Sequence, residues 1–308
     1  MKNMKNLSYT EEKFTEEEKD ANQISNRVFK GTIATQYKLV RYSSKAQEAW
    51  DKLVSNSVNG TLLHTRKFLS YHGDKFDDQS LLVYDESDTL KAIFPAAVAP
   101  SNPTIIISHP GITYGGIIHD GWIRGNRSID LFIELKNYYA NASFKELIYK
   151  VVPLIYHRIP AQDDIYALVR LNAHLYRIDL STTIDLQNRG PIAERRQRLL
   201  KKAIKSGLQI STDFENITAY WEILAANLKD RYNKKPVHSI AELLTLKDKF
   251  PDHISLVTAM LDNKVEAGSL TFDCPTLIHA QYFASSTLGR ETGALDLVIE
   301  SCIEQAKK

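Results

Sequence analysis

The chain has 308 residues, of which 43% are hydrophobic and 25% charged, and this length favours two folded domains. A formal net charge of +2 gives no general attraction for nucleic acid or for an anionic membrane, so any anion site has to be local. The two cysteines form no CxxC pair. No apolar run reaches the roughly 20 residues of a membrane helix, and the amino terminus is too polar for a signal peptide. We therefore expect a soluble protein of the reducing cytoplasm.

Residues 1–36 centre on the charged run EEKFTEEEKD and contain few branched apolar residues. This composition predicts a disordered tail or a lone surface helix. From Tyr37 the pattern changes to a strand (YKLVRY), an amphipathic helix (AQEAWDKLVSNS) and three further strands between Ser80 and Ser108. A helix over RSIDLFIELKNYYAN then precedes the run ELIYKVV. Residues 37–185 are thus predicted to form a mixed α/β domain.

The second predicted domain, residues 186–308, starts with a long basic helix that ends at Ser206. A short strand (LQIST), two helices over 218–230 and 240–250, and two strands (ISLVTAML and VEAGSLTF) joined by a turn follow it. Leu277 to Ser285 is predicted to be a mostly buried strand, and Ala294 to Ala306 a helix. This order repeats that of the first domain in outline, so we expect a duplicated fold.

The segment between the last strand and the last helix is Ser-Ser-Thr-Leu-Gly-Arg-Glu-Thr-Gly. Its glycines permit close approach of a ligand to the backbone, its hydroxyls can donate, and a helix start offers free N–H groups, so the segment suits a pyrophosphate. Arg290 could add a bidentate contact. The alternative is an ordinary turn in which Thr292 caps the helix and Gly293 permits the bend.

Two earlier segments hold polar residues that could bind a ligand. SHPGITYGGIIHD, Ser108 to Asp120, packs three glycines, two histidines and a tyrosine between a strand and a helix, which is typical of a binding loop. The alternative is that its glycines serve turns while His109 and Tyr114 pack. NGTLLHTRKFLSYH, Asn59 to His72, is a turn and a short helix that offers His64, Arg66 and Tyr71, although a plain surface position explains any one of these.

Arg196 is unusual on the basic helix. Arg195, Arg198, Lys202 and Lys205 form a charged stripe, whereas Arg196 falls within the apolar face. A guanidinium in an apolar face costs free energy unless it is paired. Arg196 therefore either meets a buried carboxylate or faces an anionic ligand in a cleft.

The chain lacks several motifs that would identify other chemistries. There is no HxxH or HExxH spacing, so no metal is expected, and there is no GxSxG, GxxxxGK[ST] or GxGxxG motif. These absences lower the expectation of a hydrolase, a nucleoside triphosphatase or a dinucleotide oxidoreductase. Among the reaction classes considered, acyl or group transfer without a covalent intermediate is the one that remains.

From Tyr37 onwards the chain resembles the FemAB-like branch of the GNAT acyltransferases, often encoded among bacterial surface-polysaccharide genes. The blocks NGTLLHTRKFLSYH, SLLVYDESDTLKAIFPAA, SHPGITYGGIIHD, RRQRLLKKAIKSG and HAQYFASSTLGRETGALDLVIE carry the resemblance. It implies an α/β fold of two GNAT-like domains, each a mixed, mostly antiparallel sheet flanked by helices. It also implies a pyrophosphate loop of pattern [QR]xxGx[GA], which residues 290–295 match except at Leu295.

The activity that the resemblance implies is direct attack of a substrate amine on an acyl-CoA thioester, such as acetyl-CoA, with backbone N–H groups around Tyr282 stabilising the oxyanion. The acceptor would be an amino sugar or a related cell-envelope precursor, without DNA, membrane insertion or a metal. The implied candidates for proton removal are His238, His279 and Tyr282. The implied cofactor-binding residues are Phe283, Ala284, Ser285, Ser286, Thr287, Gly289, Arg290, Thr292, Gly293 and Ala294. The implied substrate-binding residues, in a cleft between the domains, are His64, His109, Tyr114, Gly115, Arg196 and Gln281.

The chain departs from the family pattern because it ends before the strands that follow this helix in a complete GNAT domain. We therefore expect a truncated product with an incomplete site and an exposed strand edge, or a partner that supplies the missing strands. Two other functions stay open: aminoacyl transfer from tRNA in the manner of the Fem proteins, and a non-catalytic glycan-binding or scaffold protein. A tRNA substrate would favour a long basic surface or an inserted coiled-coil arm, and neither is visible between Asp213 and Phe250.

Overall fold

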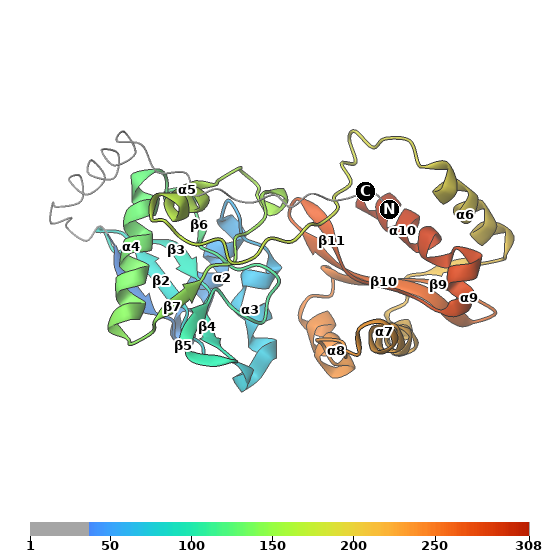
Figure 1. Cartoon of the computed structure of the whole chain (residues 1–308), viewed down its shortest axis with the longest axis horizontal. Coiled ribbons are helices and arrows are strands. Elements are labelled where there is room, and N and C mark those ends of the chain that lie inside the picture. Colours follow the sequence, from blue (N-terminus) through green and yellow to red (C-terminus); the bar gives the residue numbers. More distant parts are fainter. Residues whose placement is uncertain (1–36, 308) are drawn as a thin grey trace, which may run out of the picture. The chain divides into compact units, whose positions relative to one another are not determined.

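The structure is a computed structural model that describes residues 37–307, so the expectation of a disordered tail over residues 1–36 lies outside the described residues. The described part of the chain is a mixed α/β fold with mostly antiparallel sheets flanked by helices, which confirms the predicted fold class (Figure 1). No sheet in residues 37–307 combines strands from both sides of residue 186. The domain boundary itself stays a prediction, since these residues form one compact unit.

The amino-terminal half contains two sheets. The first is antiparallel, in the order β1 (Lys38–Arg41), β2 (Leu81–Tyr84), β3 (Leu90–Phe94) and β6 (Ile118–His119). The second joins β4 (Ala97–Ala99), β5 (Asn102–Ile107) and β7 (Glu146–Ile148), with β5 and β7 parallel. Parallel strands require a long crossover, and the chain between β5 and β7 contains α4 (Asn126–Asn141).

Further helices of this half connect and cover the two sheets. They are η1 (Ser44–Ala46), α2 (Gln47–Asn56), η2 (Leu62–His64), α3 (Arg66–Leu69), η3 (Ser70–Lys75), η4 (Leu154–Tyr156) and α5 (Asp163–Arg170), where η denotes a 3₁₀ helix. The predicted amphipathic face of α2 is confirmed, because Trp50, Leu53 and Val54 are buried there. The short helix expected near His64 is confirmed as η2 and α3, and Thr65 caps α3 by accepting from the Phe68 N–H at 3.0 Å.

The carboxyl-terminal half is a single antiparallel sheet in the order β11 (Leu277–Ser285), β10 (Lys264–Cys274), β9 (Ile254–Leu261) and β8 (Gln209–Ser211). The basic helix α6 (Glu194–Lys205) and the last helix α10 (Ala294–Ala306) lie on one face, and α7 (Ile217–Tyr232) and α8 (Ile240–Lys249) on the other (Figure 1). The 3₁₀ helix η5 (Phe214–Asn216) precedes α7. These elements confirm the order expected from hydrophobic periodicity.

The segment after β11 differs from the expected open loop. It contains a short helix, α9 (Thr287–Thr292), which Ser286 caps by accepting from the Gly289 N–H at 2.8 Å. Gly293, with φ of 81°, separates α9 from α10. Thr292 does not cap α10, since its hydroxyl donates back to the Leu288 carbonyl at 2.8 Å. The expected turn capped by Thr292 is therefore wrong, although the role of Gly293 in the bend is confirmed.

One hydrophobic cluster contains buried residues of both halves. Phe68 of α3 illustrates it, because its ring centroid lies 6.0 Å from that of Phe250 and 6.2 Å from that of Phe272. Aromatic rings at this separation contribute to packing beyond the area that they bury. The end of α3 therefore packs directly against the carboxyl-terminal half, and this contact brings the residues that follow α3 close to the sheet of β11.

Candidate active site

Strand β11 is the edge of its sheet. It pairs with β10 on one side, and among residues 37–307 no strand pairs with its other side. The register shifts between Leu270 and Thr271, whose partners are Tyr282 and Ala280, so Gln281 is the extra residue of a β-bulge. Two carbonyls of β11 already have side-chain partners, since the Tyr282 carbonyl accepts from the Tyr220 hydroxyl at 3.1 Å and the Ser285 carbonyl from Asn227 at 3.0 Å. The bulge interrupts the ladder beside Tyr282, and an edge strand of this kind is a place where an extended ligand can add.

The polar groups between β11 and α10 already have partners within the fold. Ser286 donates to the buried Glu266 carboxylate while it caps α9, so its hydroxyl has no proton left for a phosphate. Arg290 donates to the Ser285 carbonyl at 2.9 Å and to Thr287 Oγ1 at 3.1 Å. Thr287 only accepts in that contact, and both Thr287 and Arg290 are exposed. These two residues are therefore the ones best able to contact an anion.

The two glycines of the segment are required by packing. A Cβ atom on Gly289 would lie 2.2 Å from the Glu266 carbonyl oxygen, and one on Gly293 would lie 2.6 Å from the Leu199 carbonyl oxygen of α6. Gly293 also has φ of 81°, where L side chains are strained. Gly293, which matches the family loop, and Gly289, which precedes that loop, thus each have a reason in the fold that is independent of a ligand.

His238 lies between two tyrosines. Its Nε2 is 3.0 Å from the hydroxyl of Tyr71, which belongs to η3, and its Nδ1 is 2.7 Å from the hydroxyl of Tyr282 on β11. Burial lowers the pKa of His238 to about 4, so the imidazole is neutral at physiological pH. Burial also raises the pKa of Tyr71 and of Tyr282. The structure thus brings together His238 and Tyr282, two of the candidates named from the sequence, and it places Tyr71 beside them.

His279 is held in the same way. Its Nδ1 is 2.7 Å from the Tyr156 hydroxyl and its Nε2 is 2.9 Å from Gln281 Oε1. Burial lowers the pKa of His279, so it too is neutral. His238, His279, Gln281 and Tyr282 therefore form one polar group on and beside β11.

The glycine-rich loop lies inside the amino-terminal half. His64, His109 and Tyr114 are all buried, and a Cβ atom on Gly115 would lie 1.9 Å from the Ser108 carbonyl oxygen. His64 accepts from the Thr61 N–H at 3.0 Å and lies 3.2 Å from the Gly115 carbonyl, while burial lowers its pKa to about 3. These residues stabilise the amino-terminal half by packing and hydrogen bonding. They would have to leave their present positions to contact a substrate.

Arg196 pairs with Asp296 of α10 at 2.6 Å, which is the carboxylate alternative that the sequence left open. The guanidinium side chain is 60% exposed, whereas the Asp296 side chain is only 11% exposed. An ion pair with one exposed partner contributes little to stability. Arg196 thus links α6 to α10 and is the only one of the candidate substrate residues on that face of the sheet.

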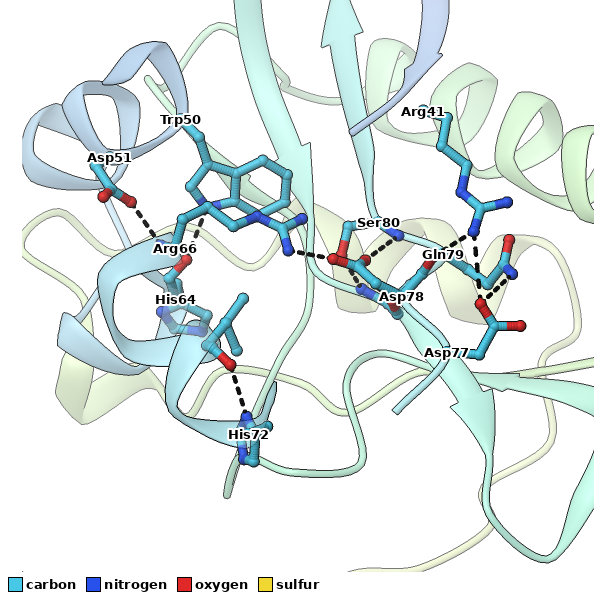
Figure 2. A network of polar contacts seen from close by, with 12 residues as sticks. Arg41, Trp50, Asp51, His64, Arg66, His72, Asp77, Asp78, Gln79 and Ser80 are labelled. Atoms are coloured by element: carbon cyan, nitrogen blue, oxygen red, sulfur yellow. Dashed lines mark hydrogen bonds and ion pairs between the residues drawn. The ribbon is translucent and has the colours of Figure 1, made fainter. Parts of the chain in front are cut away.

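A second polar network holds the start of α3, the helix that precedes Tyr71. Figure 2 shows Arg66 at the start of α3, with its guanidinium directed at Asp78 and its backbone N–H directed at Asp51. The guanidinium carbon lies 3.4 Å from the Tyr42 ring centroid and 3.9 Å from that of Trp50. Such stacking between a buried cation and aromatic faces fixes the helix start, and Tyr71 follows one turn later.

Within residues 37–307 there is no group of three or more His, Cys, Asp or Glu side chains that could hold a metal ion. Among the helices of the same residues, none combines the length and apolar character needed to cross a membrane.

The two groups of mostly antiparallel sheets flanked by helices, described above, have counterparts among solved structures. The chain is similar to the solved structure of FemX, with a TM-score of 0.60 and 11% identity over 88% of this chain and 86% of that chain. It is also similar to a tandem GNAT protein from the clavulanic acid biosynthesis pathway, with a TM-score of 0.50 and 10% identity over 87% and 85% of the two chains. No family model and no curated protein sequence matches the chain. The predicted FemAB-like, GNAT-like fold is thereby confirmed.

Proposed function

We propose that this chain is an acyl-CoA-dependent N-acyltransferase. The proposal rests on the outer side of β11, with which no strand pairs among residues 37–307, on the bulge at Gln281 and on the polar segment that follows the strand. An extended pantetheine arm can form main-chain hydrogen bonds with such an edge. Thr287 and Arg290 lie just beyond the end of the strand, where the pyrophosphate of the same ligand would reach.

The reaction is attack of an amine nitrogen on the thioester carbonyl carbon. A carbon–nitrogen bond forms and the carbon–sulfur bond breaks, so that the sulfur leaves as a thiolate. The proton that the amine loses ends on this departing sulfur, and the products are an amide and the free thiol. Backbone N–H groups at the bulge would stabilise the oxyanion, and His238, His279 and Tyr282 surround it. The acceptor that we propose is an amino sugar or a related precursor of a bacterial surface polysaccharide or cell envelope.

The alternative of aminoacyl transfer from tRNA is less well supported. A tRNA needs a long basic surface, whereas α7 and α8 are joined by residues 233–239 without an inserted helical arm. The exposed basic face of α6 is the one feature in its favour. A glycan-binding protein without catalysis is the third possibility.

Calorimetric titration of acetyl-CoA tests the proposal. We expect the wild type to bind, and Thr287→Val and Arg290→Gln each to weaken binding about tenfold, since each removes one contact to a charged group. Arg170→Gln, which removes an exposed arginine of α5 in the amino-terminal half, is the charge-matched control and should bind as the wild type does. Binding of charged tRNA or of a glycan without any acetyl-CoA affinity would reject the proposal.

A further inference from the structure

We propose that Tyr71 and Tyr156 are positioning residues that hold His238 and His279 as neutral hydrogen-bond donors directed at β11. Both tyrosines precede residue 186, and both histidines follow it. The inference refines the proposed function, on which it depends only for the identity of the group that receives the hydrogen bond.

The His279 end of the arrangement follows from donor and acceptor chemistry. The Oε1 atom of Gln281 can only accept, so His279 Nε2 carries the proton of the 2.9 Å hydrogen bond. A neutral imidazole has one N–H, so Nδ1 is the acceptor, and the Tyr156 hydroxyl donates to it at 2.7 Å. His279 is therefore held as the Nε2–H tautomer by a partner on each side.

The His238 end follows from counting protons. Two hydroxyls face one imidazole, so either Tyr71 donates to Nε2 and Nδ1–H donates to Tyr282, or the direction is reversed. Among residues 37–307, the Tyr71 hydroxyl has no other hydrogen-bond partner. The Tyr71 ring itself packs against the rings of Phe68, His72 and His238. The reversed direction would leave its proton unpartnered at a partly buried position.

The Tyr282 hydroxyl, by contrast, belongs to the edge strand β11, with whose outer side no strand pairs among residues 37–307. Burial raises the pKa of Tyr282, and the neighbouring Gln281 side chain opposes that rise because it favours the negatively charged oxygen. The Tyr282 oxygen can thus accept from His238 Nδ1–H while its own proton is directed at an acceptor on a ligand at β11. The arrangement in which Tyr71 donates gives the Tyr71 proton its partner, and it assigns His238 the Nδ1–H tautomer.

Two consequences follow for the reaction. Neither histidine has a free lone pair in this arrangement, so neither serves as the general base without first losing its tyrosine. Tyr282 instead keeps a hydroxyl proton, which can be directed at negative charge that develops on the thioester oxygen or sulfur. A hydroxyl that already accepts a hydrogen bond is a stronger donor, which is the benefit of the contact from His238.

Nitrogen-detected NMR of the full chain with ¹⁵N-labelled histidine tests the inference, because the two ring nitrogens report the tautomer directly. In the wild type we expect His238 as Nδ1–H and His279 as Nε2–H, each in roughly tenfold excess or more, the ratio set by the cost of an unpartnered buried hydroxyl. Tyr71→Phe keeps the ring and should mix the tautomers of His238 alone. Tyr156→Phe should reduce the excess of the Nε2–H tautomer of His279 and leave the tautomers of His238 unchanged.

Tyr139→Phe is the control, since it removes a buried hydroxyl that donates to the Gln79 carbonyl at 2.8 Å, away from both histidines. A His238 that is Nε2–H in the wild type, or one whose tautomer is unchanged by Tyr71→Phe, would overturn the inference. The acetyl-CoA titration of the same proteins separates the two claims. Failure of the wild type to bind would reject the proposed function, while the tautomers would still decide the inference.

Discussion

Gly293→Ala is the substitution that best separates packing from ligand binding in the segment after β11. The new methyl carbon would lie 2.6 Å from the Leu199 carbonyl oxygen, so α6 would have to move away from α10. A non-glycine residue at φ of 81° costs about 1–2 kcal/mol, and forced repacking adds about 1–3 kcal/mol. We therefore expect the free energy of unfolding to fall by about 2–5 kcal/mol.

Urea denaturation, monitored by tryptophan fluorescence, measures this loss of stability. Titration of the same variant with acetyl-CoA under native conditions measures ligand affinity separately. Ser206→Ala is a suitable control, because it alters the exposed end of α6 and leaves Leu199 in place. A variant that unfolds within about 0.5 kcal/mol of the wild type and yet loses acetyl-CoA affinity would refute the reasoning. The glycine would then be required by the ligand alone.

Two further predictions concern the amino-terminal half. Asp78→Asn removes the carboxylate that faces the Arg66 guanidinium, whose side chain is 6% exposed. Because the Asp78 side chain is 39% exposed, we expect the free energy of unfolding to fall by about 2 kcal/mol, which is less than for a fully buried pair. A change of less than about 0.5 kcal/mol in urea unfolding would contradict this. Burial lowers the pKa of His64 and of His109 to about 3 and that of His119 to about 4, so below pH 6.5 the unfolded chain binds more protons than the folded one. Stability should fall as the pH drops from 6.5 toward 4, by up to about 1.4 kcal/mol per pH unit for each histidine, and equal stabilities at pH 6.5 and 4.5 would contradict this sign.

Hydrophobic periodicity was sufficient to predict most helices and strands, because the buried face of each such element is continuous. The continuous apolar run of β2 and the apolar face of α2 are examples, and both elements are found as predicted. Helix α9 was missed because it has six residues, contains a glycine and has no apolar face to reveal it. The amphipathic helix α5 was also missed, although Ala167 on its inner side is buried.

The site was harder to predict because its contacts are not local. The sequence singles out His238 and Tyr282, but 167 positions separate Tyr71 from His238 and 123 separate Tyr156 from His279. No spacing rule connects such pairs. The glycine-rich loop shows the reverse difficulty, since close backbone packing demands glycine just as a ligand does, and the structure accounts for Gly115 by packing against Ser108.

The bulge at Gln281 also bears on how the molecule behaves in a crowded solution. Strand β11 has nine residues, and an unpaired strand of that length is a template on which another chain can add. An extra residue near its middle twists the strand and shifts the spacing of its outer N–H and C=O groups. A regular strand from a neighbouring molecule can therefore match only one end of β11 at a time. The irregularity that places Tyr282 thus also makes the exposed edge a poor seed for aggregation.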